Sequence, residues 1–387
     1  MAGSIQDRGN GSYFLTVSAG FKSGGKRNRK TRTVQAKNIT EARKKLAAFV
    51  AEVEADEYVA PSHIKLAQYV KIWRKDAAKK VSPKTIETYD YVLNGRILPI
   101  LGHHKIEKLS HIHINDFLET LEADDLGTST IQKHYNVLNS IFKLAVKNET
   151  IKKNPMDKVD KPSVTYKPGE VYNSNELKQL FLLLNQEENN QMVLMVKMAL
   201  KTGLRKGELL ALQWDDVDFA TNTIHVRHSL SYTKENGYQL KEPKTKGSIR
   251  KVAPPKKLMD ELRKHKLIKS TERIEAAELW EGGKCFFVFS TDFGKPFFPS
   301  VPNRWWTRFI NRVNIGLKKN DKPLLKKIRF HDLRHTAATD LINKGANIHS
   351  ISKRLGHANI TTTMNIYGHY LEEADQKIAD MLDEDYI

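Results

Sequence analysis

Three short motifs in the last sixty residues carry side chains that suit chemistry on an anion. His331 and Arg334 lie three residues apart, so on a helix they would share one face. A guanidinium there can hold an anionic oxygen, while an imidazole accepts or donates a proton. His357 follows in a Leu-Gly-His segment, and Tyr367 stands ten residues beyond it. Because a phenol beside a bound phosphate can be a covalent nucleophile, these residues predict covalent chemistry on a phosphate ester.

A second arginine, Arg205, stands far upstream at the predicted start of a helix, with Glu208 one turn later to orient its guanidinium. The unpaired amides of a helix N-terminus also favour an anion. Alone, this would be an ordinary surface ion pair. Arg205 and Arg334 together offer two forked hydrogen-bond donors, and His357 could hydrogen-bond the same phosphate. Such donors suit a phosphodiester whose nonbridging oxygens gain charge in a pentacovalent transition state.

Two alternatives compete for these residues. His331 and His335 have the spacing of a zinc hydrolase motif, but the next residue is Asp332 rather than the glutamate base. Arg334 between the histidines would also repel a cation, so we expect no metal site. Tyr370, one helical turn after Tyr367, is a rival for the nucleophile.

Charge points to the partner that supplies the phosphate. The 387 residues include 64 Lys and Arg against 45 Asp and Glu, a net charge of +19 with a pI near 9.6. Residues 1–40 hold eight basic residues against one acid, whereas residues 371–387 hold seven acids against one lysine. A net charge of this size alone would also fit a soluble protein whose lysines are simply solvated. The concentrated basic arm favours nucleic acid, and the acidic end suggests a regulatory or docking tail.

Composition also bounds the cellular setting. Cys285 is the only cysteine, which excludes a disulfide framework and a cysteine-based metal site. It stands in a run of phenylalanines and valine that reads as a buried strand, so we predict a core residue. No apolar run approaches the roughly 20 residues needed to span a bilayer, and the N-terminus lacks a signal-peptide core. We expect a cytoplasmic protein.

The basic arm forms a small module over residues 1–56. Aromatic and β-branched residues predict a strand over 12–19, a second strand ends near Val34, and a helix follows from about Thr40. This ββα-type unit carries a basic ribbon that can enter a DNA groove, although the same ribbon would serve as a solvated hairpin. We predict that it contacts DNA through Lys26, Arg27, Arg29, Lys30 and Arg32.

Two larger units follow. Residues 63–155 have helical periodicity throughout and predict a bundle of about four helices without a catalytic constellation. A proline- and lysine-rich linker separates it from residues 170–387, which predict a mixed α+β unit. The fold class is therefore multidomain and mainly α with small β elements.

Five separated motifs occur in an order that resembles the tyrosine recombinase (phage integrase) family. They cover roughly 165 residues and are Gly203-Leu204-Arg205-Lys206-Gly207-Glu208, Lys244-Thr245-Lys246, His331-Asp332-Leu333-Arg334-His335-Thr336, Leu355-Gly356-His357 and Tyr367. The layout of arm module, helical core-binding domain of the SAM-like type and catalytic domain is similar to the integrases of phages and conjugative transposons.

The resemblance implies a role for each motif residue. Tyr367 would attack the scissile phosphate and form a 3′-phosphotyrosyl link, which keeps the bond energy, so neither ATP, metal nor another cofactor is expected. Arg205 and Arg334 would hold the nonbridging oxygens, with Glu208 organising the arginine. His331 would assist proton transfer and His357 would stabilise the transition state. Lys244 would protonate the leaving 5′-oxygen, and Lys246 is the alternative in the same turn.

We therefore expect a site-specific DNA recombinase that integrates or excises a mobile element. It would act as a homotetramer on two duplex attachment sites, with an excisionase or a host DNA-bending protein as accessory partner. Two alternatives remain on the same fold. A DNA-binding regulator would have no need of the nucleophile, and a type IB-like topoisomerase would have no need of the arm module.

Overall fold

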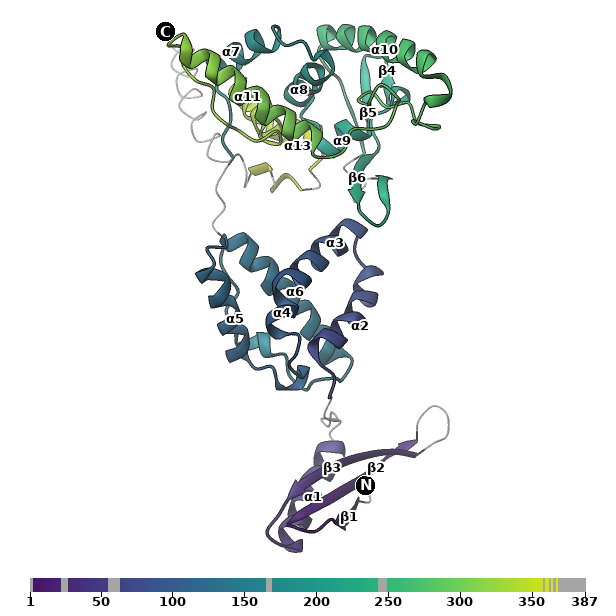
Figure 1. The fold of residues 1–387 in the computed structure, drawn as a ribbon, viewed down its shortest axis with the longest axis vertical. Helices are drawn as coiled ribbons and strands as arrows, with labels where there is room; N and C mark the ends of the chain where they lie inside the picture. The colour runs from purple at the N-terminus through teal and green to yellow at the C-terminus, as the bar shows by residue number, and fades with distance from the viewer. Residues whose placement is uncertain are drawn as a thin grey trace, which may run out of the picture. The chain divides into compact units, whose positions relative to one another are not determined.

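The computed structural model divides the chain into two compact units, Met1–Thr165 and Tyr166–Ile387. It describes residues 3–21, 27–54, 63–164, 169–242, 249–357, 359–361, 363, 364 and 367, without the side chains of residues 20, 21 and 27. Figure 1 shows the helices and strands of each unit. Among the described residues, no helix is long and apolar enough to cross a membrane.

The arm module is a three-stranded antiparallel sheet covered by one helix. Its strands are β1 (Gly3–Asp7), β2 (Ser12–Phe21) and β3 (Arg27–Gln35), in the order β1-β2-β3, and the helix is α1 (Ile39–Glu54). Leu15 and Val17 of β2 pack with Phe49 of α1 in a small apolar core. The sequence predicted β2, β3 and α1 but not β1. This edge strand is short, polar and mostly exposed, so it lacks the apolar alternation that marks a strand.

The helical bundle follows its predicted pattern. Its helices are α2 (Leu66–Ala78), α3 (Pro83–Val92), α4 (Leu98–Leu101), α5 (His111–Ala123) and α6 (Thr128–Lys147); the π-helical turn η1 (Leu93–Ile97) joins α3 to α4 in one continuous rod. Short 3₁₀ turns are η2 (Ile106–Lys108) and η3 (Pro155–Lys158). Ser82 caps α3 by accepting a hydrogen bond from Thr85, and Pro83 occupies the first helical position, where its missing amide costs nothing.

The second unit combines helices with two small sheets. Helices α7 (Ser174–Leu184), α8 (Asn190–Thr202) and α9 (Lys206–Ala211) lead through the turn η4 (Trp214–Asp216) into the strands. Strands β4 (Val217–Asp218), β5 (Thr223–Val226) and β8 (Arg250–Val252) form one sheet, and β6 (Ser229–Thr233) and β7 (Gly237–Lys241) form a hairpin. The chain then continues through α10 (Lys256–Ala276), η6 (Ala277–Leu279), α11 (Val301–Lys319), α12 (Asp332–Asn343) and α13 (Ile348–Leu355).

Helix α8 is the centre of this unit. Most of its residues are buried, and it contacts α9, α10 and α12. The expectation of a strand around Cys285 was wrong. That segment makes an isolated bridge between Gln213 and Phe287, and Cys285 itself is only half-buried. Val288 and Phe289 still enter the core, so the apolar run identified buried residues but not their backbone conformation.

Two glycines in the left-handed conformation bring the ends of three helices together. Gly203 ends α8 at φ +69°, and a Cβ there would lie 2.6 Å from Leu355. Gly356 ends α13 at the same φ, and a Cβ there would lie 2.8 Å from the guanidinium of Arg250. Glycine permits both the turn and the close approach. Helices α8, α9 and α13 therefore meet at one point, where the predicted catalytic motifs lie.

Candidate active site

Arg205 is fixed by the carboxylate predicted to orient it. Its Nη1 donates to Glu208 Oε1 at 2.8 Å, and its backbone amide donates to Oε2 at 2.9 Å. Its Nη2 donates to the carbonyl oxygen of Gly356 at 3.1 Å, which joins α9 to the end of α13. About a third of the Arg205 side chain remains exposed, so the guanidinium is positioned and still reachable by an anion.

Arg334 is the buried arginine of the cluster, with 3% of the residue exposed. Its Nη1 donates to the carbonyl of Gly203 at 2.5 Å, and its Nη2 donates to the carbonyl of Leu355 at 2.7 Å. Burial and then the neighbouring Arg205 lower the pKa of this guanidinium to about 9, while Glu208 opposes the shift. The guanidinium therefore keeps its positive charge at neutral pH. Among the described residues, it donates to two backbone carbonyls and to no carboxylate.

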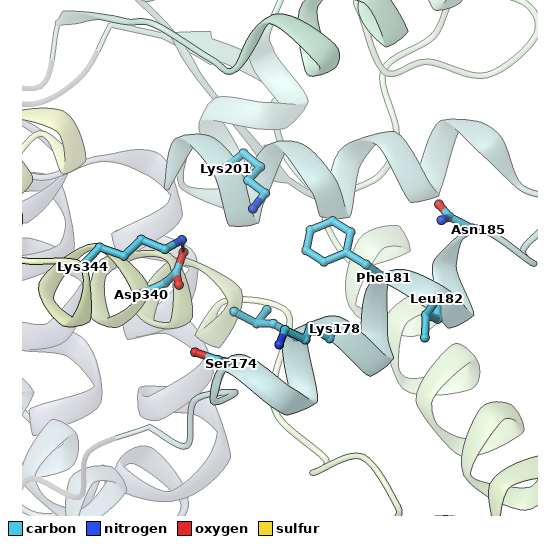
Figure 2. A pocket seen from close by; sticks show the side chains of 9 residues that line it. Ser174, Lys178, Phe181, Leu182, Asn185, Lys201, Asp340 and Lys344 are labelled. Atoms are coloured by element: carbon cyan, nitrogen blue, oxygen red, sulfur yellow. Dashed lines mark hydrogen bonds and ion pairs between the residues drawn. The ribbon is translucent and has the colours of Figure 1, made fainter.

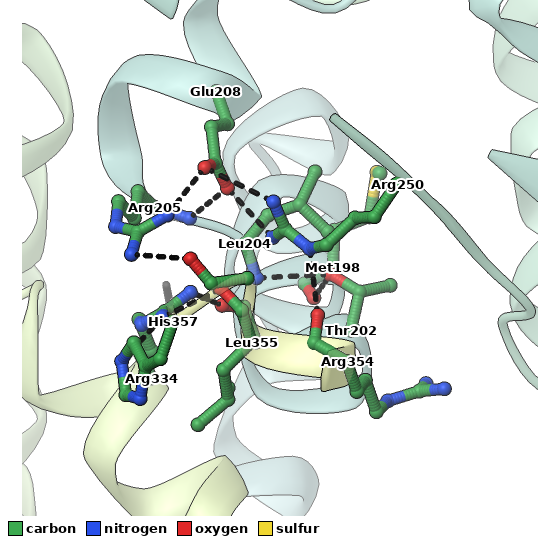
Figure 3. Close-up of polar contacts among 12 residues, drawn as sticks. Met198, Thr202, Leu204, Arg205, Glu208, Arg250, Arg334, Arg354, Leu355 and His357 are labelled. Atoms are coloured by element: carbon green, nitrogen blue, oxygen red, sulfur yellow. Dashed lines mark hydrogen bonds and ion pairs between the residues drawn. The ribbon is translucent and has the colours of Figure 1, made fainter. Parts of the chain in front are cut away.

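His357 completes this arrangement with a defined tautomer. Arg334 Nη2 lies 2.9 Å from His357 Nε2, and His357 Nδ1 lies 2.7 Å from Thr363 Oγ1. Burial, and then Arg334 and Arg205, lower the pKa of His357 to about 4, so the ring is neutral. Since a guanidinium only donates, Nε2 accepts, and the proton stands on Nδ1, where it is donated to Thr363. Figure 3 shows Arg334 and His357 close to Arg205 and Glu208.

Tyr367 lies in the same unit, against helix α12. The residue is 1% exposed and packs with Ile342, Ile351 and Leu355. Its phenol oxygen is 2.7 Å from Nδ1 of His335. His331 is exposed at the start of α12, and its ring meets that of His335 edge-on at 5.4 Å. Protein atoms that displace water around the exposed ring, and then the neighbouring His335 and Arg334, lower the pKa of His331.

Arg250 is a central residue that the sequence reading missed. Its Nη2 donates to Glu208 Oε2 at 2.8 Å, its Nη1 to Oε1 at 3.2 Å, and its Nε to the carbonyl of Arg354 at 2.7 Å. One guanidinium therefore ties strand β8 to the carboxylate that orients Arg205 and to the turn before His357 (Figure 3). The only signal in the sequence was an arginine two residues before a buried valine, a spacing that puts both on one face of a strand.

The structure brings together five predicted site residues with Tyr367: Arg205, Glu208, His331, Arg334 and His357. Lys244, its alternative Lys246 and the rival nucleophile Tyr370 lie outside the described residues. A cleft of about 940 Å³ opens beside His357 and is lined in part by Lys251, Lys353 and Arg354. Its basic walls suit an anionic ligand.

A separate groove of about 580 Å³ lies between α7, α8 and α12 (Figure 2). Its apolar surface comes from Leu177, Phe181 and Leu182, and Lys201 and Lys344 stand at its edge. It contains none of the predicted catalytic residues.

In the arm, the predicted basic ribbon divides between two faces of the sheet. Lys30 and Arg32 stand opposite Val17 and Leu15 of β2, on the face that α1 covers. Arg32 pairs with Glu52 of α1 at 2.6 Å. Arg29 stands opposite Ser18, on the other face, and is exposed. Lys26 and the side chain of Arg27 lie outside the described residues.

Comparison with known proteins identifies the family. The model of the phage integrase family matches residues 170–374, which is more than half of the chain and includes the arginine cluster and Tyr367. The chain belongs to the phage integrase family. A model of the N-terminal SAM-like domain of phage integrases matches residues 65–121, within the helical bundle.

Relatives match along nearly the whole length. The ICEBs1 integrase of Bacillus subtilis (strain 168) is 29% identical over 98% of this chain and 99% of its own. A XerC-like tyrosine recombinase of Caldanaerobacter subterraneus is 27% identical, with coverage of 97% and 96%. Residues 82–397 of the Tn1549 transposon integrase, solved with transposon right end DNA, share the fold with a TM-score of 0.67, at 23% identity over 83% of this chain and all of that fragment. This integrase is therefore a tyrosine-type site-specific DNA recombinase.

Proposed function

We propose that this integrase cuts and rejoins duplex DNA at the attachment sites of a mobile element, with Tyr367 as the nucleophile and Arg205 and Arg334 as the clamp on the phosphate. One observation carries the proposal. The buried Arg334 guanidinium and the His357 imidazole are hydrogen-bonded, in the unit that holds a phenol against α12. The oriented Arg205 lies across the same helix ends. A phosphodiester held by these two arginines would lie in the unit that carries the phenol.

The reaction assigns a task to each group. The Tyr367 oxygen attacks phosphorus, the bond to the 5′-oxygen breaks, and a 3′-phosphotyrosyl ester forms. Arg205 and Arg334 neutralise the charge that grows on the nonbridging oxygens, and a neutral His357 shares the site with them. His331, exposed at the start of α12, assists proton transfer. Lys244, or Lys246 in the same turn, protonates the 5′-oxygen.

Strand rejoining is the same step reversed, because the phosphotyrosyl ester conserves the energy of the broken bond. The guanidinium groups provide the charge that a divalent ion provides in other phosphoryl-transfer enzymes, so the reaction needs neither ATP nor metal. The match to a whole-length integrase, including the arm, favours recombination over a topoisomerase. The intact set of motif residues in the sequence, including a tyrosine nucleophile, favours an enzyme over a DNA-binding regulator.

The assembly follows from the number of strands. Each chain carries one nucleophile, held by a histidine of the same chain, and exchange between two duplexes requires four strand cleavages. We therefore propose a homotetramer, in the cytoplasm, with an excisionase or host DNA-bending protein setting direction. Residues 1–56 would bind arm sites, residues 63–155 core sites, and residues 170–387 would perform the chemistry.

A nicked suicide substrate tests this function. Cleavage next to the nick releases a short strand, so the covalent protein–DNA adduct accumulates. We expect adduct in the wild-type chain and in Tyr370→Phe, in EDTA as well as without it, and none in Tyr367→Phe, which should still bind the site in a gel shift. Adduct in Tyr367→Phe would refute the nucleophile, and loss of cleavage on chelation would bring back the zinc hydrolase.

A further inference from the structure

His335 is the second histidine of the H-x-x-x-H spacing, and neither a metal nor the phosphate clamp accounts for it. It lies on α12, one turn after His331, and is half-buried. Its Nδ1 is 2.7 Å from the phenol oxygen of Tyr367, a hydrogen-bond distance, and the two ring centroids are 5.6 Å apart. The imidazole therefore touches the atom that has to lose a proton.

The burial of Tyr367 limits where that proton can go. With 1% of the residue exposed and aliphatic side chains of α12 and α13 packed against it, Tyr367 is shielded from bulk water. A proton leaves a buried hydroxyl most readily to an acceptor already within hydrogen-bond distance. A phenolate left without such a partner in apolar surroundings would be strongly disfavoured.

The surroundings keep His335 ready to accept. Burial lowers the pKa of its imidazole; the cations of Arg334 and Arg329 lower it further, while Asp332 opposes them. Asp332 is itself held by Arg329 in a two-point ion pair of 2.9 and 2.8 Å. The titratable and charged groups facing the ring from α12, the turn before it and the segment after α13 are His331, Asp332, Arg329, Arg334, His357 and Tyr367.

We propose that His335 is the general base of the reaction, a role that rests on Tyr367 being the nucleophile. As the phenol oxygen forms its bond to phosphorus, its proton passes to His335 Nδ1, and the bond from phosphorus to the 5′-oxygen breaks. In rejoining, the imidazolium returns that proton to the departing tyrosine. His331 then acts on the phosphate side, and the two histidines of one helix divide the proton chemistry between two ends of the reaction.

Two substitutions separate proton transfer from positioning. The carboxamide of His335→Asn places an oxygen or nitrogen close to the position of Nδ1, so it can hold the phenol by a hydrogen bond but cannot take its proton. His335→Ala removes both functions and leaves space for a small base. Both variants are made in the full chain and checked for specific DNA binding, so that a folding defect is recognised.

The assay is single-turnover adduct formation on a suicide substrate whose 5′-bridging oxygen is replaced by sulfur. Sulfur leaves without a proton, so the rate no longer depends on the general acid. We expect both variants to form adduct at least about 100-fold more slowly than the wild-type chain. Added imidazole should accelerate His335→Ala in proportion to its unprotonated fraction, and should leave His335→Asn slow.

The outcomes are separable. Wild-type rates in His335→Asn would overturn the proposal, because a hydrogen bond alone would then suffice. Failure of imidazole to accelerate a His335→Ala variant that still binds DNA would also overturn it. Adduct formation by Tyr367→Phe would instead refute the proposed nucleophile. The same experiment therefore distinguishes failure of the general base from failure of the nucleophile.

Discussion

The helical bundle and the second unit, Tyr166–Ile387, differ in the kinds of side chain that they bury. The second unit holds the predicted catalytic residues and is called the catalytic unit from this point. The bundle buries an apolar core, and of its described residues only His134 and Asn154 are polar and buried. The catalytic unit buries Glu208, Asp332 and three basic residues, Arg250, Lys269 and Arg334. A buried charge costs free energy unless it is paired and hydrogen-bonded. The bundle thus has an almost entirely apolar core, whereas the catalytic unit also buries charges, three of which, on Glu208, Arg250 and Arg334, lie in the arginine cluster.

Within the catalytic unit, the charges differ in how completely they are paired. Arg250 and Glu208 form a bidentate pair with both side chains at least 95% buried. Arg334, equally buried, is held by two backbone carbonyls and a neutral imidazole. The first arrangement is complete without DNA, and the second leaves a positive charge for the ligand to neutralise. Substitutions of Arg334 and Arg250 should therefore affect catalysis to different extents.

The largest effect is expected for Arg334→Ala. Removing one donor to a developing oxyanion typically costs about 10²–10³ in rate, or on the order of 3 kcal/mol. Single-turnover cleavage should fall by at least that factor, while Arg334→Lys, which keeps charge but loses the fork, should recover only part of it. Gel-shift binding and far-UV circular dichroism provide the controls. Near wild-type cleavage by a folded Arg334→Ala chain would remove this residue from the clamp.

Arg250→Lys should have a smaller effect, because Arg250 acts through Glu208 and Arg205. By analogy with residues that orient metal ligands, we expect cleavage to fall roughly 10- to 100-fold. A methylphosphonate at the scissile position carries no negative charge. On DNA with this group, the difference in cleavage rate between Arg250→Lys and the wild-type chain should therefore become smaller. A matched control is Arg354→Lys, which loses contacts to the carbonyls of Lys201 and Ala253. An unchanged gap would mean that Arg250 only supports the fold.

Acid should destabilise the catalytic unit more than the bundle. In the catalytic unit the pKa values of His265 and His357 are lowered to about 4, both chiefly by burial, and those of His331 and His335 are lowered as well. Unfolded histidine titrates near 6.5, so protonation favours the unfolded chain and stability falls as the pH drops from about 6.5 towards 4. In thermal scans, the catalytic transition should shift further than that of the bundle, and less in His265→Gln. Parallel shifts would contradict this.

The smallest effect separates two arginines of the arm. Arg29, on the open face, is expected to contact a DNA phosphate, so Arg29→Ala should reduce the slope of log affinity against log salt by about one unit. Arg32 is paired with Glu52, so Arg32→Ala should cost about 1 kcal/mol or less of stability and leave the slope unchanged. The reverse result would mean that DNA meets the helix-covered face.

The sequence predicted the parts of this account that depend on local order. The five motifs, the strands β2 and β3 and the helices of residues 63–155 all follow from neighbouring residues. Contacts between distant segments could not be read in this way. Arg250 bonds to Glu208 across 42 residues, and Tyr367 meets His335 across 32. The sequence excluded the metal site that the H-x-x-x-H spacing would suggest, but it assigned no role to His335. Only the packing of α12 shows that this histidine contacts the phenol.

The covalent link between protein and DNA tests the central claim most directly. A wild-type adduct trapped on a suicide substrate would be digested with protease and nuclease, and the modified peptide identified by mass spectrometry. The account predicts a nucleotide joined through its 3′-phosphate to the Tyr367 oxygen, and a free 5′-hydroxyl on the released strand. A link to Tyr370 or to any other residue, or attachment through a 5′-phosphate, would contradict it.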